Sequence, residues 1–412
     1  MEIITLEKAD TIFDSYVEIA LCAESSVFHW IYLRDNCTCE KCFIEATVQR
    51  TLDTFNELPW KVSRQTYAAE APTEAVFEIS EGNLRVTWPD GHVSVFSEDW
   101  LRRHSYQPAL TTKPKALVFP PKSHWDRGQF EKLLGDGARF STRYDNLVNE
   151  LPTVLREIYE YGFTFVRDVP VSIEATKTVS ELISIIRPTH YDTGVWDFTS
   201  DLAKKDTAYT TVAIDMHTDG NYWHELPGLQ LFHLLQHSDG EGGETRIVDV
   251  AKIVDQLREL AAEDESWRTT YKVLTEHPLA FHQSGEAENV FYQADYPTLT
   301  LDATGELEQC RWNTSDRIAQ APLASGSQYT VPQVYQALFR FNSLINDEKN
   351  FVQFKLEPGT ILVFDNWRVL HARTSFTGYR RLCGSYLTRD DFLARLRSIM
   401  FDREAIKDEI YQ

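Results

Sequence analysis

The pattern of hydrophobic and polar positions divides the chain into a β-rich beginning, a helical middle stretch and a long β-rich remainder. Before residue 107, short apolar runs alternate with turn residues, and we predict strands at Phe28–Asp35 and Asn83–Phe96. The second run contains Pro89-Asp90-Gly91, which has the residue types of a tight turn, so it predicts a hairpin.

Helical periodicity follows a stretch rich in proline and lysine, residues 107–123, which we interpret as a linker. Leu147–Gly162 predicts a helix that ends on a glycine suited to a C-terminal cap. Ser172–Arg187 predicts a second helix, because its apolar residues recur at helical spacing on one face. Later helical patterns lie at 252–262, 331–345 and 390–400.

From about Thr207 onward, β-type segments dominate the sequence. They are separated by glycine-containing turns, and they comprise TAYTTVAIDMH, LQLFHLLQ, TRIVDV, GTILVFDNW, VLHAR and RLCGSYLT. Several short strands with such turns are typical of a sandwich or a jelly roll.

Composition and charge narrow the possible functions. The 412 residues carry a formal net charge of -21, which disfavours nucleic acid as a partner, because a phosphate backbone attracts a basic surface. No run of about eighteen apolar residues is present, so we expect no membrane span. The first residues are acidic, with no arginine before Arg34, so we expect a cytoplasmic protein and leave a mitochondrial location open.

Three of the six cysteines lie close together, at Cys37, Cys39 and Cys42, and His92 lies in the predicted hairpin turn. Three thiolates and one imidazole form a closed tetrahedral zinc site of the structural kind. The alternative is three reduced, partly buried cysteines, but the tight Cys-x-Cys-x-x-Cys spacing favours zinc.

The motif His-x-Asp provides two arms of the two-His-one-carboxylate site that holds iron in non-haem oxygenases. On a strand, residues i and i+2 point to the same face, so both side chains reach one metal. The motif alone is a weak signal here, because it occurs at His124/Asp126, His190/Asp192, His217/Asp219 and His237/Asp239. Only His217 ends a long β-type run with another strand shortly downstream.

A late histidine with a nearby arginine completes the pattern of a 2-oxoglutarate site. His371 is followed, across a short turn, by Arg380 and Arg381. The planar guanidinium binds a carboxylate through two hydrogen bonds, and alternation along a strand allows only one of the two arginines to face inward. Taken singly, His371 could be a hydrogen-bonded core histidine and the arginine a surface ion pair. Because His371 and the arginine occur together with an upstream His-x-Asp motif, these separate explanations are less favoured.

At these residues the chain resembles the γ-butyrobetaine/trimethyllysine hydroxylase family of Fe(II)/2-oxoglutarate oxygenases. The matching stretches run through most of the chain and include RDNCTCEKC, WPDGHVSVFSEDWL, HTDGNYWHELPGLQLFHLLQH, GGETRIVD and FDNWRVLHARTSFTGYRRLCGSYLTRDD. The last of these is most similar to the trimethyllysine branch. The resemblance implies a mainly β fold with flanking helices, in which a double-stranded β-helix (jelly-roll) catalytic domain at 124–412 follows a small zinc domain at 1–106 and the linker at 107–123.

The resemblance also implies roles for individual residues. Iron would be held by His217, Asp219 and His371, and 2-oxoglutarate by Arg380 with the hydroxyl of Thr245. It places Trp196 and Tyr209, with Tyr191 as a third wall, in an aromatic cage for a trimethylammonium group, which cannot donate hydrogen bonds. Asn313 resembles a position that contacts the zwitterionic end of the substrate, although a turn-capping asparagine is an equal alternative.

The implied reaction is hydroxylation of N6,N6,N6-trimethyllysine at C3, the first step of carnitine biosynthesis. Fe(II), 2-oxoglutarate, ascorbate and a structural zinc are the implied cofactors, and a homodimer is the implied assembly. One alternative is hydroxylation of γ-butyrobetaine to carnitine at the same kind of site. An alternative of another class is a non-catalytic protein that binds methyl-lysine, although such a protein needs neither the iron triad nor Arg380.

Overall fold

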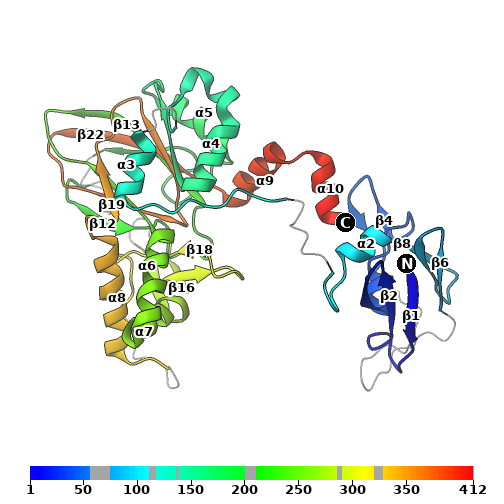
Figure 1. Cartoon of the computed structure of the whole chain (residues 1–412). Helices are drawn as coiled ribbons and strands as arrows, with labels where there is room; N and C mark the ends of the chain where they lie inside the picture. The colour runs from blue at the N-terminus through cyan, green and yellow to red at the C-terminus, as the bar shows by residue number, and fades with distance from the viewer. Residues whose placement is uncertain are drawn as a thin grey trace. The chain divides into compact units, whose positions relative to one another are not determined.

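The computed structural model describes residues 1–55, 75–110, 117–135, 139–199, 210–284, 290–319 and 328–411. By its internal contacts the chain forms two compact units (Figure 1). One consists of Met1–Phe119 with Phe401–Gln412, and the other of Pro120–Met400. Among the described residues, no helix is both long enough and apolar enough to cross a membrane.

The first unit is built on two antiparallel sheets of three strands, with strand orders β1-β2-β3 and β6-β7-β8. Their strands, with the short pair β4 and β5, span Glu2–Glu7, Tyr16–Leu21, Glu24–His29, Phe43–Ile44, Gln49–Arg50, Val76–Ser80, Asn83–Thr87 and Val93–Ser97 in chain order. The helices of this unit are α1 (Trp30–Asp35), α2 (Glu98–Arg103) and α10 (Arg403–Tyr411).

The sequence prediction for this unit was right at the hairpin and wrong at one strand. Strands β7 and β8 pair in register, and the Trp88 amide donates to the His92 carbonyl across the turn. The predicted strand Phe28–Asp35 is instead the end of β3 followed by helix α1. The buried residues of α1 are Trp30, Leu33 and Arg34, which lie on one face at the helical spacing i, i+3, i+4. Burial of that face, rather than strand propensity, decides the local structure.

The second unit contains a six-stranded and a four-stranded sheet. The six-stranded sheet has the order β11-β22-β13-β20-β10-β9, with bounds Trp196–Thr199, Tyr379–Leu387, Leu229–Ser238, Ile361–Asp365, Phe163–Arg167 and Thr142–Arg143. The four-stranded sheet has the order β12-β21-β14-β19, with bounds Ile214–His217, Val369–Arg373, Thr245–Asp249 and Phe351–Phe354. Two small hairpins are β15-β16 and β17-β18, with bounds Pro278–Gln283, Tyr292–Pro297, Leu299–Leu301 and Leu307–Cys310.

The two larger sheets pack face to face. One continuous apolar cluster contains Phe163, Leu362 and Leu382 from the six-stranded sheet and Ile247 and Val369 from the four-stranded sheet. A second cluster packs α6 (Val250–Glu263), α7 (Glu265–Glu276) and α8 (Val331–Ile345) around the small hairpins (Figure 1). The other described helices of this unit are α3 (Arg127–Gly135), α4 (Leu147–Tyr161), α5 (Ile173–Ile183) and α9 (Arg389–Met400), and a 3-10 turn, η1, spans Tyr144–Asn146.

The predicted helices of this unit are present, with differences at their ends. Helix α4 ends as expected, because Gly162 adopts the left-handed conformation with φ 80° and its amide donates to the Ile158 carbonyl. Helix α5 begins after the N-cap Ser172 but stops at Ile183, four residues before the predicted end. Helices α3 and α7 of this unit were not predicted.

Candidate active site

The pairing of β12 with β21 brings together two histidines that are far apart in the sequence. His217 lies directly opposite His371 in the strand register, and their ring centroids are 4.1 Å apart. Asp219 follows two residues after His217, and its carboxylate lies 3.2 Å from Nε2 of His217 and 3.9 Å from Nε2 of His371. The three side chains therefore present one carboxylate and two imidazole nitrogens to a common point, a donor set suited to iron(II).

The carboxylate of Asp219 is held by neighbours that come from the six-stranded sheet. Gln230 on β13 donates to Oδ2 at 2.5 Å, and the Tyr386 hydroxyl on β22 donates to the same oxygen at 2.8 Å. The side chain of Asn366 fixes the backbone, since it accepts from the Asp219 amide and donates to the Asp219 carbonyl, both at 3.0 Å. Such hydrogen bonds set the orientation of a metal-binding carboxylate.

The pKa shifts of His371 and Asp219 fit metal binding. Burial lowers the pKa of His217, but the Asp219 carboxylate and the Asp215 carbonyl outweigh burial and raise it. Nδ1 of His217 lies 2.8 Å from the Asp215 carbonyl, and donation of its proton to that oxygen leaves Nε2 for a metal. Burial lowers the pKa of His371 to about 3, so its imidazole is neutral at physiological pH. Burial opposes the charge of Asp219, but hydrogen bonding from His217, the nearby His371 and the Tyr386 hydroxyl outweigh it and hold the pKa below the usual range.

A buried cation lines the same cavity. Arg380 on β22 is 7% exposed, and its Nε has no hydrogen-bond partner among the described residues. Burial, with repulsion from Arg373, lowers the pKa of Arg380 to about 10, so the side chain is still charged at neutral pH. A buried cation with an unused donor is suited to a carboxylate from a ligand. The adjacent Arg381 points the other way and pairs with Asp197 at 2.6 Å.

The cavity has a volume of about 310 Å³ and brings together most of the predicted site residues. Its lining includes His217, Asp219, His371, Arg380, Thr245, Tyr191 and Asn313.

Tyr191 and Tyr222, which also lines the cavity, form a polar aromatic wall. The Tyr191 hydroxyl lies 3.2 Å from the Tyr222 hydroxyl and accepts from Gln283 Nε2 at 3.3 Å. Asn313 lines the cavity and also caps a turn, since its Oδ1 accepts from the amides of Ser315 and Asp316.

One predicted cage residue, Trp196, does not line the cavity. Trp196 is 2% exposed and stacks behind Phe198, with ring centroids 4.4 Å apart, and it is Phe198 that lines the cavity. The indole fits there because Gly384 has no side chain: a Cβ on that glycine would lie 2.3 Å from the Trp196 ring. Tyr209 lies outside the described residues.

The other His-x-Asp pairs have different surroundings. His124 Nδ1 lies 2.7 Å from Asp255 Oδ2, and His237 Nε2 lies 3.2 Å from the Thr377 carbonyl. His190 packs on Tyr191 with ring centroids 4.0 Å apart. In the part of the chain that the structure describes, none of these pairs forms a cluster of three metal-binding groups.

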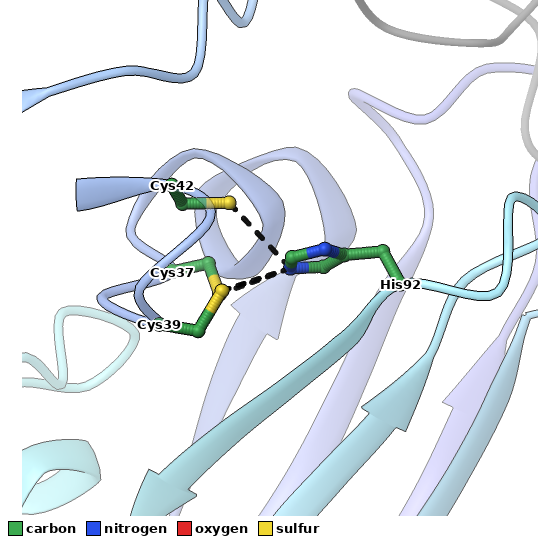
Figure 2. Close-up of side chains that lie close together, drawn as sticks. All are labelled: Cys37, Cys39, Cys42 and His92. Carbon is green, nitrogen blue, oxygen red and sulfur yellow. Dashed lines mark hydrogen bonds between the residues drawn. The ribbon is translucent and has the colours of Figure 1, made fainter.

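A second cluster lies in the first unit, where three sulfurs surround one imidazole nitrogen (Figure 2). Nε2 of His92 is 3.3, 3.6 and 3.5 Å from the Sγ atoms of Cys37, Cys39 and Cys42. Zinc bonds of about 2.3 Å to sulfur and 2.0–2.1 Å to nitrogen give a tetrahedron whose sulfur–nitrogen edge is about 3.5 Å. Burial lowers the pKa of His92, which keeps the imidazole neutral and able to bind a metal. The residues present therefore fit a zinc ion.

Several residues of the site were not found from the sequence. Gln230, Asn366 and Arg373 had no motif to mark them, because their roles come from contacts between segments that lie far apart in the sequence. Tyr386 had a signal, since Arg380, Leu382, Gly384 and Tyr386 alternate along one strand and share a face.

Comparison with known proteins agrees with this geometry. The family described as taurine catabolism dioxygenase TauD, TfdA matches residues 129–386, and the family described as γ-butyrobetaine hydroxylase-like, N-terminal, matches residues 16–102. A trimethyllysine dioxygenase from Meyerozyma guilliermondii is 38% identical over 395 residues, which cover 94% of each chain. The chain belongs to the trimethyllysine dioxygenase family. It is therefore an iron- and 2-oxoglutarate-dependent dioxygenase, and the family resemblance seen in the sequence is confirmed.

Other members of this family show a similar relationship. The trimethyllysine dioxygenase from Homo sapiens, which is named mitochondrial, is 34% identical over 90% of this chain and 82% of its own. A γ-butyrobetaine dioxygenase from Pseudomonas sp. (strain AK-1) is 30% identical over 90% of both chains. Among solved structures, a taurine dioxygenase from Burkholderia xenovorans aligns with a TM-score of 0.43 at 13% identity, over 66% of this chain and 91% of its own.

Proposed function

We propose that the protein hydroxylates N6,N6,N6-trimethyllysine at C3, with Fe(II) and 2-oxoglutarate. The observation that carries the proposal is the shared cavity, in which His217, Asp219 and His371 lie at one place and the buried Arg380 at another. The similarity to proteins named trimethyllysine dioxygenase, at 34–38% identity over most of the chain, supports the substrate.

In this proposal His217, Asp219 and His371 hold the iron, and the three remaining coordination positions are open for ligands. With O₂ as the oxidant, the bound metal and 2-oxoglutarate would supply oxidative decarboxylation, in which CO₂ is released, one oxygen atom enters succinate and the other hydroxylates the substrate. The side chains of the protein position the iron ligand and the 2-oxoglutarate. Gln230 and Tyr386 fix the Asp219 carboxylate, and Arg380, with the Thr245 hydroxyl, holds the far carboxylate of 2-oxoglutarate.

The trimethylammonium group is proposed to lie against aromatic faces. Tyr191 and Tyr222 are supported as walls by their place in the cavity lining, and Phe198 by its place in front of Trp196. Tyr209 remains part of the proposal through the family resemblance. Quaternary ammonium groups are held in this way because they attract electron-rich rings but donate no hydrogen bond. Asn313 is proposed to contact the zwitterionic end.

We propose further that the two packed sheets form a double-stranded β-helix, or jelly roll, and that residues 1–106 form a structural zinc domain. Support for zinc comes from the tetrahedral spacing of Cys37, Cys39, Cys42 and His92. The proposal also includes a linker at 107–123, a catalytic domain at 124–412, a cytoplasmic location, a homodimer and an effect of ascorbate. These parts of the proposal rest on sequence pattern and resemblance. Light scattering of the purified protein tests the dimer, and omission of ascorbate from the assay tests its effect.

The experiment that tests the proposed reaction is a substrate comparison. Fe(II)-loaded protein is incubated with 2-oxoglutarate, ascorbate and either trimethyllysine or γ-butyrobetaine, and succinate and product mass are measured. We expect a gain of one oxygen on trimethyllysine, lost in His217→Ala and retained in His237→Ala, which alters another His-x-Asp pair. A preference for γ-butyrobetaine would refute the substrate but keep the chemistry. Absence of turnover with both substrates would refute the proposed reaction.

A further inference from the structure

A loop that is neither helix nor strand forms part of the cavity wall. This loop, Thr218–Gly228, connects β12 to β13 and carries Asp219 and Tyr222, both of which line the cavity. Asn221 is fully buried and Tyr222 is 4% exposed, so water has little access to the backbone between them. Buried carbonyls in a segment without regular structure need donors from elsewhere in the chain.

Arg311 supplies those donors. It follows directly after β18 and is 2% exposed. Its Nη1 donates to the carbonyls of Asn221 and Trp223 at 3.0 and 2.6 Å, and its Nη2 donates to the carbonyl of His224 at 2.6 Å. One guanidinium therefore fixes three carbonyls within four successive residues of the loop.

The surroundings of Arg311 are adapted to this role. Its Nε donates to the Gln309 side chain at 2.9 Å, and its Cζ lies 3.8 Å from the centre of the Tyr296 ring. The structure records no ion pair for Arg311 with any residue that it describes. A buried arginine without a carboxylate partner is unusual, and its donors are directed to backbone oxygens instead. The rigid fork of a guanidinium reaches several carbonyls at once, which an ammonium group cannot reproduce.

The segment that carries Arg311 also continues into the cavity wall. The Thr218 amide donates to the Trp312 carbonyl at 2.8 Å, and the Trp312 amide donates to the Thr218 hydroxyl at 3.1 Å. The next residue, Asn313, lines the cavity. Arg311 thus joins two segments of the wall, one ending in Asn313 and the other carrying Tyr222.

We propose that Arg311 is a positioning residue for the substrate, because it holds the Tyr222 and Asn313 segments in a fixed relation to each other. This inference rests on the proposed function, in which these segments contact the substrate. It predicts an effect on the substrate rather than on the metal. The Asp219 carboxylate and backbone have their own supports in Gln230, Tyr386 and Asn366, none of which depends on Arg311.

The test compares Arg311→Lys with a matched control, Arg340→Lys. Arg340 also stacks on an aromatic ring, Trp267, at 4.3 Å and donates to Thr270 and Ser266, but it lies on α8 and does not line the cavity. Five quantities are measured: the KM for trimethyllysine, the KM for 2-oxoglutarate, the product formed per succinate, the affinity for Mn(II) as an iron substitute, and amide hydrogen exchange in residues 218–228.

In Arg311→Lys we expect the KM for trimethyllysine to rise about tenfold or more and the product per succinate to fall. Exchange in residues 218–228 is expected to accelerate about tenfold, because the carbonyls lose their donors and the loop opens more often. The Mn(II) affinity and the KM for 2-oxoglutarate should stay within about twofold of the wild-type values. In Arg340→Lys all of these quantities should match the wild type.

The proposal is overturned if Arg311→Lys has the wild-type KM for trimethyllysine, the wild-type product per succinate and wild-type amide exchange. It is also overturned if the Mn(II) affinity and all kinetic constants are impaired together. If Arg311→Lys does not fold, Tyr296→Leu serves as the second variant, since it removes the ring beneath the guanidinium, and with it the hydroxyl 3.2 Å from Nδ1 of His224 in the loop, while leaving the arginine in place. The same rise in the KM for trimethyllysine and the same faster exchange are then expected, and wild-type values of both would overturn the proposal. Should the wild type prefer γ-butyrobetaine, the proposed substrate fails, but the role of Arg311 is tested with that substrate. The exchange measurement needs no substrate and so separates the two failures.

Discussion

His371 lies directly opposite His217 in the pairing of β21 with β12, so the distance between the two imidazoles is set by strand register. Their ring centroids are 4.1 Å apart, and the register is irregular between Ile214 and His217. A shift of one residue in either strand would turn one imidazole to the opposite face of the sheet. From the six-stranded sheet, Gln230 and Tyr386 line the cavity and donate hydrogen bonds to the Asp219 carboxylate.

Replacement of Tyr386 by phenylalanine should weaken metal binding without disturbing the fold. The ring is kept, but the hydrogen bond of 2.8 Å to Asp219 Oδ2 is lost, so the carboxylate is less well oriented. Loss of such a partner typically costs about 10- to 100-fold in metal affinity or activity. Titration with Mn(II) measures the effect. Tyr379→Phe, on the exposed part of the same strand, is the control, and equal affinities in the two variants would contradict the prediction.

Replacement of Arg380 by glutamine should raise the KM for 2-oxoglutarate. A hydrogen bond to a charged group contributes about 1.5–3 kcal/mol, which corresponds to roughly a 10- to 150-fold change. The KM for trimethyllysine should change much less. Steady-state assays at varied 2-oxoglutarate concentration measure both quantities.

The neighbouring Arg381 provides the control for that experiment. Arg381→Gln removes the ion pair with Asp197 on the other face of the strand, and we expect a wild-type KM for 2-oxoglutarate. If Arg381→Gln impaired 2-oxoglutarate use as strongly as Arg380→Gln, the assignment of Arg380 would be wrong.

The cysteine cluster predicts one zinc ion per chain with a structural role. Cys42→Ser removes a buried sulfur, so we expect loss of the zinc and a lower melting temperature, because a structural zinc contributes directly to folding. Elemental analysis and calorimetry measure these effects. Cys22→Ser alters an exposed cysteine outside the cluster and should keep both the zinc and the melting temperature. A zinc-free wild-type protein with unchanged stability would argue against this site.

The buried His233 predicts a stability that falls with acidification. Burial lowers the pKa of His233 to about 4, whereas an unfolded histidine has a pKa of about 6.5. Between these values the unfolded chain binds more protons than the folded one, so the free energy of unfolding decreases as pH falls from about 6.5 to 4. The slope contributed by this one group is up to about 1.4 kcal/mol per pH unit.

His233→Asn should remove that contribution from the pH dependence, measured by urea unfolding at several pH values. The variant Thr176→Val is the control, because it removes the hydroxyl that lies 2.8 Å from Nδ1 but keeps the histidine, and so should keep the slope. Parallel pH profiles for the wild type and His233→Asn would show that another group is responsible.

Much of the secondary structure followed from local pattern. Helix α8 occupies Val331–Ile345 as predicted, where Thr330 forms a capping box with Gln333 and a proline follows at the start of the helix. Strand β21 coincides with the predicted VLHAR segment. Where local pattern was ambiguous, packing decided, as at α1, whose short apolar run gave no reliable helical signal.

The sequence by itself determined the chemistry of the sites. The spacing of His217 and Asp219, the three cysteines with His92, and the late His371 with two arginines identified the donor groups, because these signals depend only on residue type and strand or turn periodicity. Alternation along one strand also required Arg380 and Arg381 to face opposite ways, and the structure has them so.

Only the tertiary structure decided which residues meet. The His-x-Asp motif occurs four times, and although its β-type context favoured His217 in the sequence, it is the pairing of β12 with β21 that places this pair, alone among the described residues, in a metal-binding cluster with a second histidine. Likewise, Phe198 rather than Trp196 reaches the cavity, and Arg311 reaches three carbonyls of a distant loop. The physical reason is that burial, register and hydrogen-bond satisfaction depend on contacts between segments far apart in the chain, and no local pattern encodes them.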